Sequence, residues 1–360
     1  MIFPFTAIVG QEEMKLGLIL NVINPSIGGL LIMGEKGTAK STAVRALAEL
    51  LPEIETVKGC PFNCDPDGPL CTGCRETLEK ECRLERERKK MKVVELPLGV
   101  TEDRLIGTLD IEHAIKKGEK RFEPGILAGA NRNFLYVDEV NLLEDHIVDL
   151  LLDSAAMGVN TVEREGVSFT HPARFILVGT MNPEEGDLRP QLLDRFGLCV
   201  HVGSIADKAE RVEILRRKAA FDADPEKFTA EWQPEQDMLS KRIGAAKKRL
   251  GHIRPSDTVL EDIVSITASL DLDGHRADIV LMKAAMTLAA FRSAGKDENK
   301  DTRLMGDLSY AASTITNDDI RKVAGLALSH RMKRLPFEEM GMDMRRLEAA
   351  LSMGFSHDVQ

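Results

Sequence analysis

The stretch GGLLIMGEKGTAKST, residues Gly28–Thr42, places an apolar run before a glycine-containing loop and a Lys-Ser pair. The run has the composition of a buried strand, and TAVRALAELL, which follows the loop, has that of a helix. A strand, a glycine loop, a Lys-Ser pair and a helix in this order are typical of a P-loop, where backbone N–H groups and a helix N-terminus bind phosphate. The stretch therefore predicts a nucleotide site on an α/β fold.

The loop carries the residues that would hold phosphate and its metal ion. Lys40 would reach the β and γ oxygens of ATP, and the Ser41 hydroxyl would bind Mg²⁺. Ala39 stands where the usual pattern has glycine, so we expect retained, if weaker, binding. A chance match in a turn is the alternative, and the flanking strand and helix argue against it. The predicted phosphate-binding residues are Gly34, Glu35, Lys36, Gly37, Thr38, Ala39, Lys40, Ser41 and Thr42.

A second motif, FLYVDEVN at Phe134–Asn141, is an apolar run that ends in two acids. Acids at a strand end are typical of a Walker B motif, in which Asp138 would bind Mg²⁺ and Glu139 would orient and deprotonate the attacking water. Alone, such a pair is often only a solvated strand end. Its position downstream of a P-loop favours the catalytic interpretation.

Three further polar residues extend the predicted site. Asn182 follows the apolar run ILVGTM and would hold the attacking water beside the Walker B acids. Arg195, in LLDRF, is either a salt-bridge partner or an arginine that enters a neighbouring subunit's site and neutralises transition-state charge. Arg276 opens a helix in DGHRADIVLMKAAM and could close over the γ-phosphate, although its spacing alone favours a surface arginine. The candidate catalytic residues are Glu139, Asn182, Arg195 and Arg276.

The order of apolar patterns predicts the fold class. Over about the first 200 residues short β-rich runs alternate with helical patterns, which is typical of a parallel sheet flanked by helices. From about Ser204 onward only helices are expected. We therefore expect a nucleotide-binding core over residues 1–203, a helical linker over 204–254 and an all-helical C-terminal domain over 255–360. The expected strands are Gly29–Met33, Val93–Leu96, Asn133–Val137, Arg174–Gly179 and Leu198–Val202. The expected later helices are Ala206–Ala219, Gln236–Leu250, Pro255–Leu270, Arg276–Ala294 and Asn317–Lys333.

The net charge of the chain limits the kinds of partner that it is expected to bind. Acidic residues outnumber basic ones, 58 to 48, and the net charge of −10 argues against a general affinity for nucleic acid or anionic membrane. Arg75–Lys92 mixes both signs, so we expect a solvated helix face there rather than a nucleic-acid contact. Phe221–Pro234, with its two prolines, is expected to be a linker. We find no signal or transit pattern and no membrane span, so we expect a cytoplasmic protein with reduced cysteines.

Together and in this order, the motifs resemble those of the AAA+ ATPases. Longer segments resemble the small ATPase subunit of magnesium chelatase, among them FTAIVGQEEMKLGLILNVINPS, ELPLGVTEDRLIGTLD and NPEEGDLRPQLLDRFGL. The resemblance implies that Ile8, Val9 and Gly10 lie near the adenine, that Arg195 is an arginine finger and that Arg276 is the second sensor.

The resemblance also implies cofactors, partners and a function. It implies ATP and Mg²⁺, a self-assembled ring that we expect to be a hexamer, an AAA+-like D subunit and a porphyrin-binding H subunit. The implied function is ATP-driven insertion of Mg²⁺ into protoporphyrin IX for chlorophyll or bacteriochlorophyll synthesis. Two alternatives share every nucleotide motif: a MoxR-type remodelling chaperone and the ATPase subunit of a cobalt or nickel chelatase.

Two insertions are expected to form hairpins. One runs from LGVTEDRLIGTLD to KRFEPGILAGA, and the other covers Asn160–Arg174 with a turn at Glu165-Gly166. Loops on a rigid ATPase core are where mechanical output would be delivered, and plain packing loops are the alternative.

The stretch CPFNCDPDGPLCTGC, Cys60–Cys74, opens a cysteine-rich loop that we assign to residues 60–82. Its Cys60, Cys64, Cys71 and Cys74 could close around Zn²⁺ as four thiolates, although the six-residue spacer is short for common zinc modules. Relatives in plastids are associated with thiol regulation, so redox-sensitive or loop-structuring thiols are favoured over zinc, and inert surface cysteines are third. Cys82 offers a fifth thiol on the adjoining helix, and Cys199 is expected to be a small core residue.

Overall fold

The structure is a computed structural model of the chain. It describes residues 1–35, 37–110, 121–164, 167–272, 274–295, 314–332 and 344–355. The chain divides into two compact units. The first unit contains Met1–Val9, Gly34–Leu188 and Gly203–Trp232, and the second contains Gly10–Met33, Arg189–Val202 and Gln233–Gln360.

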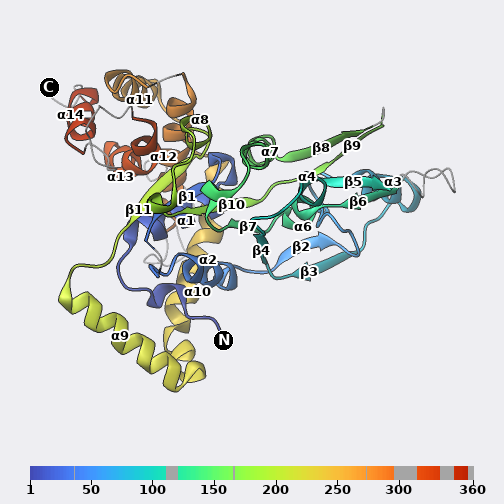
Figure 1. The fold of residues 1–360 in the computed structure, drawn as a ribbon, viewed down its shortest axis with the longest axis horizontal. Helices are drawn as coiled ribbons and strands as arrows, with labels where there is room; N and C mark the ends of the chain where they lie inside the picture. The colour runs from blue at the N-terminus through green and yellow to red at the C-terminus, as the bar shows by residue number, and fades with distance from the viewer. Residues whose placement is uncertain are drawn as a thin grey trace, which may run out of the picture. The chain divides into compact units, whose positions relative to one another are not determined.

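A five-stranded sheet has the strand order β11-β1-β10-β7-β4 (Figure 1). Its members are β1 (Leu30–Gly34), β4 (Val93–Leu96), β7 (Phe134–Val137), β10 (Ile176–Met181) and β11 (Leu198–Val202). Strand β7 pairs in parallel with both β10 and β4. Strands of a parallel sheet are covered on both faces, which is why these segments are continuous apolar runs rather than alternating ones. The α/β fold class and all five expected strands are confirmed.

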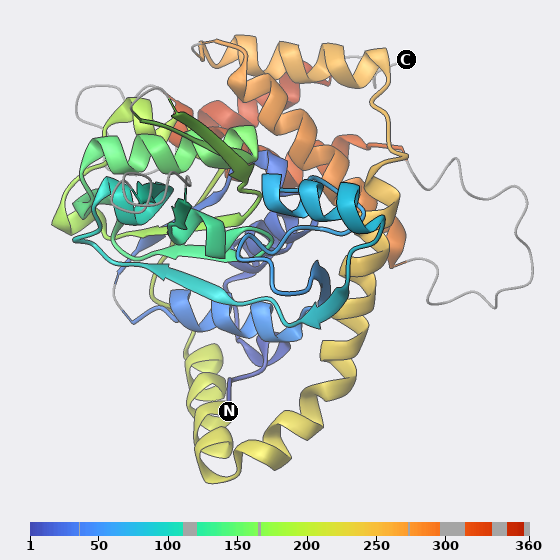
Figure 2. The same ribbon diagram turned by 90° about the vertical axis from the view of Figure 1, so that its right-hand side faces the viewer.

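Helices and two hairpins complete the first unit around these strands. Helix α2 (Lys40–Leu50) follows the P-loop, and α7 (Asp145–Met157) follows the Walker B segment. The expected hairpins are present as antiparallel pairs: β5 (Gly107–Asp110) with β6 (Arg121–Pro124), and β8 (Val159–Arg164) with β9 (Val167–Pro172). Both extend from the sheet on the same side (Figures 1 and 2). The turn expected at Glu165-Gly166 lies outside the described residues.

Short helices flank the first hairpin. They are α4 (Glu102–Ile106), directly before β5, and α6 (Ile126–Ala130), shortly after β6. The two helices pack against each other. The hairpin therefore leaves the core between two helical segments.

The expectation of a single helix face over Arg75–Lys92 is wrong in its second half. Helix α3 (Thr72–Glu81) ends at Cys82, whose φ is 53°, and β3 (Arg86–Lys89) then pairs antiparallel with β2 (Ile54–Val57). Arg86 and Arg88 both form ion pairs with Glu55 on β2. Cross-strand charge pairs of this kind stabilise a two-stranded ladder, which charge interleaving alone does not distinguish from a solvated helix.

The linker expected at Phe221–Pro234 is also wrong, because the segment is helical. It covers the end of α9 (Lys208–Ala223) and the first part of α10 (Pro225–Leu250). Pro225 is the first residue of α10, where a missing N–H breaks no helical hydrogen bond. Pro234 lies inside the helix but is exposed, so the backbone carbonyl one turn earlier, which has no N–H partner there, can bind water. Phe228 is 5% exposed and packs against Phe3. Tertiary packing outweighs the two prolines.

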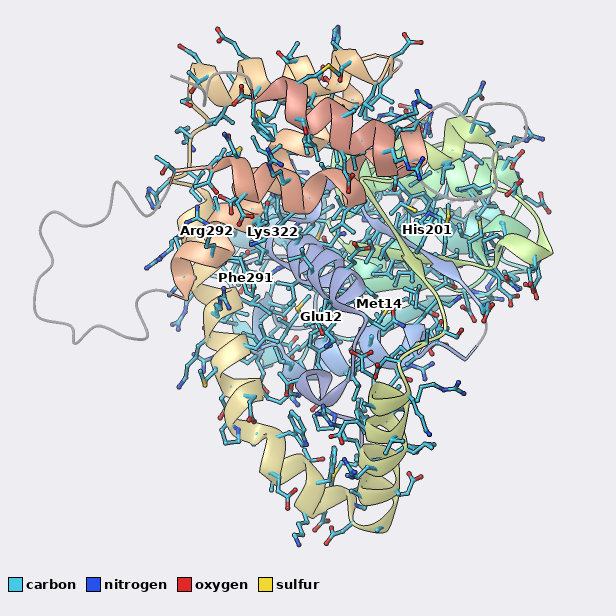
Figure 3. The ribbon with its side chains drawn as sticks, turned by 90° about the vertical axis from the view of Figure 1, so that its left-hand side faces the viewer. Glu12, Met14, His201, Phe291, Arg292 and Lys322 are labelled. Atoms are coloured by element: carbon cyan, nitrogen blue, oxygen red, sulfur yellow. The ribbon has the colours of Figure 1, made fainter. Side chains whose placement is uncertain are left out.

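The second unit is mainly helical, as expected for the C-terminal part. Its helices are α1 (Glu12–Ile23), α11 (Asp257–Ser269), α12 (Arg276–Ala294), α13 (Asn317–Leu328) and α14 (Met344–Gly354). Figure 3 labels Phe291 and Arg292 on α12 and Lys322 on α13. Helices α12 and α13 pack together, and Arg292 pairs with the buried Asp319, whose carboxylate also caps α13. The end of the last expected helix, Lys333, lies outside the described residues.

Within the ranges that the structure describes, no helix combines the length and apolar character needed to cross a membrane.

Candidate nucleotide site

The P-loop lies between β1 and α2, in backbone conformations that open its centre. Gly34 and Gly37 have φ values of 155° and 86°, and Ala39 has a left-handed φ of 60°. Apart from Gly37 and its chain neighbours, no atom of the described residues lies within 4 Å of the position that a Cβ on Gly37 would occupy, so a ligand can approach the backbone there. Ala39 immediately precedes Lys40, the first residue of α2. The first N–H groups of a helix have no acceptor within it, and this end of α2 therefore suits an anion.

Two side chains of the P-loop region donate hydrogen bonds to backbone oxygens of the same loop. The Lys40 Nζ donates to the backbone oxygen of Gly34 at 2.5 Å, and the Thr38 hydroxyl donates to the oxygen of Glu35 at 2.9 Å. Ser41 lies in the first turn of α2, as does Thr42. Predicted residue Lys36 lies outside the described residues. The open backbone and the cationic side chain are suited to a polyphosphate.

The two Walker B acids are joined by a threonine of the neighbouring strand. In the parallel register Val137 lies opposite Gly179, so Asp138 and Thr180 emerge side by side. The Thr180 hydroxyl donates to Asp138 Oδ1 at 2.6 Å and accepts the N–H of Glu139 at 3.1 Å. The Thr180 hydroxyl thus links the carboxylate of Asp138 to the backbone of Glu139.

A second hydroxyl orients Asp138. The Tyr136 phenol donates to the same Oδ1 at 3.0 Å, and the pKa of Tyr136 is raised, first by burial and then by the charge of Asp138. The phenol therefore remains a donor at neutral pH. Two donors on one oxygen fix the plane of the carboxylate, which suits an oxygen ligand for Mg²⁺. Glu139 has a left-handed φ of 53°, which is uncommon for a residue with a side chain.

Asn182 lies at the carboxyl end of β10, on the strand next to β7. It is 7% exposed, and its Oδ1 accepts the N–H of Glu184 at 3.3 Å as the cap of the short 3₁₀ helix Pro183–Glu185. The side-chain oxygen of Asn182 is used in the cap, and its amide nitrogen can donate a hydrogen bond to a water. The structure brings Asn182 to the same sheet edge as the Walker B acids.

Ile8 and Val9 follow the 3₁₀ helix η1 (Phe5–Ala7), which packs against α2. Ile8 is buried and Val9 is half-buried, and Gly10 follows with a φ of 64°. An apolar segment beside the P-loop helix is suited to a flat base such as adenine.

The two predicted arginines belong to the second unit. Arg276 Nη1 donates to Asp194 Oδ2 at 2.7 Å, and the buried Arg331 donates through Nε to Asp194 Oδ1 at 3.1 Å. Burial lowers the pKa of Arg331 to about 10, and the guanidinium stays charged at neutral pH. Arg195 follows Asp194 directly and is half-buried. Arg276 is exposed, in line with the surface arginine that its spacing favoured, and its ion pair with Asp194 couples it to the Arg195 segment.

Sequence reasoning missed four residues of these groups: Tyr136, Thr180, Asp194 and Arg331. Thr180 had a signal, because it is a polar residue within the apolar run ILVGTM. Asp194 and Arg331 had none: Arg331 lies 137 positions from Asp194, in a basic segment typical of a surface.

The cysteines of the 60–82 loop lie outside this group. Cys60, Cys64, Cys71 and Cys74 are all buried, so the reading of inert surface cysteines is wrong for these four. Cys82 is exposed, stands at the end of α3, and is not part of the thiol cluster. Cys199 is 1% exposed in β11, a core residue as expected, and burial raises its pKa to about 12.

Comparison with known proteins identifies the family. The chain is 55% identical to a magnesium-chelatase subunit ChlI homolog of Methanocaldococcus jannaschii, over 98% of this chain and 91% of the relative. The chain belongs to the magnesium chelatase ChlI family. It is also 50% identical to the magnesium-chelatase 38 kDa subunit of Rhodobacter capsulatus, over 96% of this chain and 92% of the relative.

Family models and solved structures agree with this assignment. Residues 111–206 match the model of magnesium chelatase subunit ChlI, and residues 260–298 and 311–350 match an AAA lid domain. A solved structure of the complex between subunits BchI and BchD of magnesium chelatase is similar at 48% identity, with a TM-score of 0.52, over 97% of this chain and 99% of that chain. The expected AAA+ fold is confirmed.

Proposed function

We propose that this protein is the ATP-hydrolysing subunit of a magnesium chelatase that acts in the cytoplasm and drives insertion of Mg²⁺ into protoporphyrin IX. The observation that carries the proposal is the group formed by Asp138, Thr180 and Glu139 at the sheet edge, in which Thr180 holds the Asp138 carboxylate and the backbone of Glu139. Relatives that carry the magnesium-chelatase name match nearly the whole chain. We therefore take their named activity as that of this protein.

The phosphate end of the site would be held by the P-loop. Lys40 would balance the charge of the β- and γ-phosphates, while Ser41 and Asp138 would hold Mg²⁺. Bound Mg²⁺ would neutralise charge that develops on the phosphate oxygens. Ile8 and Val9 would cover the adenine.

Hydrolysis requires a water that is positioned and deprotonated. Glu139 would take the proton from the attacking water, and Asn182 would hold that water through its amide nitrogen. Thr180 accepts the Glu139 N–H and so holds the backbone from which the base projects.

The remaining roles belong to an assembly. Arg195 would enter the neighbouring subunit's site in a ring, and Arg276 would act as the second sensor once released from Asp194. We propose residues 1–203 as the motor core, 204–254 as the connection and 255–360 as the lid. A D subunit would join the ring, and an H subunit would bind the porphyrin, because aromatic residues make up only 4% of this chain.

Reconstitution tests the proposal. The protein is mixed with the D and H subunits of a bacterial magnesium chelatase, ATP, Mg²⁺ and protoporphyrin, and Mg-porphyrin fluorescence is followed. We expect metal insertion that requires ATP and that is lost in Lys40→Ala, because the phosphate site then loses its lysine charge.

Two outcomes would overturn the assignment. Insertion of Co²⁺ or Ni²⁺ but not Mg²⁺ would identify a different chelatase. ATP hydrolysis without insertion of any metal, in a mixture whose own ATPase subunit supports insertion, would identify a remodelling ATPase.

A further inference from the structure

Four thiols that are separated in the sequence meet at one point of the first unit. Their sulfur atoms all lie within 4.8 Å of one another, and their residues are 8% exposed or less. Cys60 and Cys64 lie in the loop after β2, Cys71 caps α3, and Cys74 lies in its first turn. The CxxxC and CxxC pairs therefore form a single cluster rather than two separate sites.

The sulfur spacing matches a tetrahedral metal site. The Sγ atoms of Cys60 and Cys71 are 3.8 Å apart. Four sulfurs at about 2.3 Å from a zinc ion, in tetrahedral arrangement, lie about 3.8 Å from one another. A disulfide needs about 2.05 Å between sulfurs, and all these cysteines are free.

Backbone hydrogen bonds hold the cysteines of this cluster in place. The Cys71 N–H donates to Cys64 Sγ at 3.1 Å, a hydrogen bond that stabilises a thiolate. The N–H of Val57 donates to the oxygen of Cys64 at 2.9 Å and closes the loop that contains the first cysteine pair, and the N–H of Asn63 donates to the oxygen of Cys60 at 3.3 Å in a turn between the two cysteines.

The short spacer between the pairs is accommodated by a turn. Asp65 accepts the N–H of Asp67 on its side chain at 3.1 Å and the N–H of Gly68 on its backbone oxygen at 3.1 Å. The chain reverses there and brings Cys71 back to Cys64. Six residues are therefore enough to close the site.

We propose that Cys60, Cys64, Cys71 and Cys74 bind one zinc ion as four thiolates. Four protein ligands leave no open coordination position, so the metal is structural and not catalytic. Clusters of two or four irons place bridging sulfides between the cysteines and hold the thiolates farther apart than this group. The geometry thus favours a single tetrahedral ion over the regulatory thiols expected from the sequence.

The loop that holds the metal site packs against both hairpins. Phe62, between the first two cysteines, packs against Phe122 of β6 and Phe169 of β9, with ring centroids 6.2 Å and 5.9 Å away. Phe122 and Phe169 stack on each other at 4.1 Å. The loop that the metal closes therefore carries the ring on which both hairpins meet, and we call these cysteines and phenylalanines the cysteine junction.

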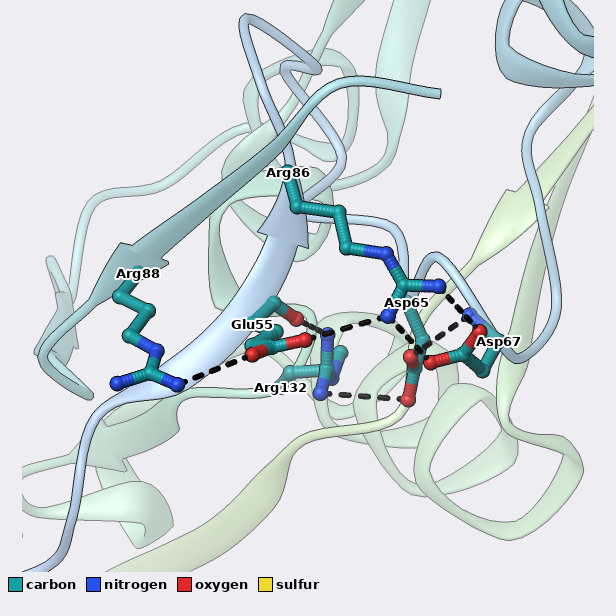
Figure 4. Close-up of polar contacts among 6 residues, drawn as sticks. All are labelled: Glu55, Asp65, Asp67, Arg86, Arg88 and Arg132. Atoms are coloured by element: carbon teal, nitrogen blue, oxygen red, sulfur yellow. Dashed lines mark hydrogen bonds and ion pairs between the residues drawn. The ribbon is translucent and has the colours of Figure 1, made fainter. Parts of the chain in front are cut away.

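Other contacts on the loop are mostly at the surface. Arg86 pairs with Asp67 and Glu55, and Arg132 pairs with Asp65, as Figure 4 shows. Exposed ion pairs contribute little to stability, and the apolar cluster around the cysteines is small. A zinc ion is the strongest cross-link available to this segment.

Metal analysis tests the site directly. Protein purified under reducing conditions, without added metal, is analysed by plasma mass spectrometry, and a mercurial thiol reagent is then used to release the metal. We expect about one zinc per chain, released with modification of the cysteines, and less than about a tenth of that in Cys64→Ser or Cys74→Ser. The matched control Cys82→Ser, a change of the exposed thiol, keeps its zinc.

Wild-type protein alone also suffices, should these variants fail to fold. Replacement of zinc by Co²⁺ should give the visible bands and near-ultraviolet charge-transfer bands of a tetrahedral tetrathiolate. Less than a tenth of an equivalent of zinc after reductive incubation with Zn²⁺, a stoichiometric content of iron, or an octahedral cobalt spectrum would overturn the proposal.

Hydrogen exchange tests the link to the hairpins. After zinc removal under reductant, peptides that contain β5–β6 and β8–β9 should exchange several-fold faster, while peptides of α2 are unchanged. Equal exchange with and without zinc would overturn the supporting role. Neither readout uses ATP hydrolysis, so the result stands apart from the proposed function.

Discussion

The nucleotide corner and the cysteine junction lie in the same unit but are built in opposite ways. The corner consists of the P-loop with Asp138, Glu139 and Thr180, and it combines charged groups with left-handed backbone at Ala39 and Glu139. The junction consists of buried thiols, the buried ring of Phe62 and the half-buried, stacked rings of Phe122 and Phe169. Polar groups held in strained backbone are typical of catalytic sites, whereas buried sulfur and aromatic side chains stabilise the fold. Substitutions in the nucleotide corner should therefore affect ATP turnover more than folding. Substitutions in the cysteine junction should affect folding more than ATP turnover.

The largest effect on turnover is expected for Glu139→Gln. An amide cannot accept the proton of the attacking water, so ATP hydrolysis should fall by about 10²- to 10⁴-fold. Nucleotide binding and zinc content should not change. Phosphate release, with fluorescent-nucleotide binding as the control, measures both.

Turnover within about twofold of wild type would show that Glu139 is not the base. Loss of zinc in the same variant would show that the corner and the junction are not independent.

A smaller effect is expected for Thr180→Val, which preserves shape but removes the hydroxyl shared by Asp138 and Glu139. A hydrogen bond to a charged group contributes about 1.5–3 kcal/mol, so turnover should fall about 10- to 100-fold. Thr180→Ser keeps the hydroxyl and is the matched control. Equal activity of the valine and serine variants would mean that the bridge does not position the acids.

The smallest effect is expected for Ala39→Gly. Left-handed backbone costs a residue with a side chain about 1–2 kcal/mol, and the greater freedom of glycine in the unfolded chain offsets about half of that. The variant should be about 0.5–1 kcal/mol more stable, with phosphate binding at least as tight. Urea unfolding without nucleotide measures the change, and a destabilised variant would contradict a strained Ala39.

The sequence-based predictions succeeded where local pattern and tertiary structure agree. The five strands are apolar enough to be recognised alone, and the residues of the two central strands β7 and β10 are all buried. They failed at β3 and at Phe221–Pro234, where charge and proline content suggested a solvated helix and a linker. In both places a partner distant in sequence decides: β2 pairs with β3, and Phe3 packs on Phe228.

By itself, the sequence determined the phosphate loop, the Walker B acids and the α/β fold, because each depends on neighbours within a few residues of one strand and turn. Only the tertiary structure decided that the Thr180 hydroxyl contacts both the Asp138 carboxylate and the Glu139 N–H, because Thr180 and Asp138 are 42 residues apart in the sequence. The same is true of the thiols and of Phe62, Phe122 and Phe169, which form one junction. The spacing of cysteines limits which metals are possible, but sulfur-to-sulfur distances depend on how the turn at Asp65 and the start of α3 fold together.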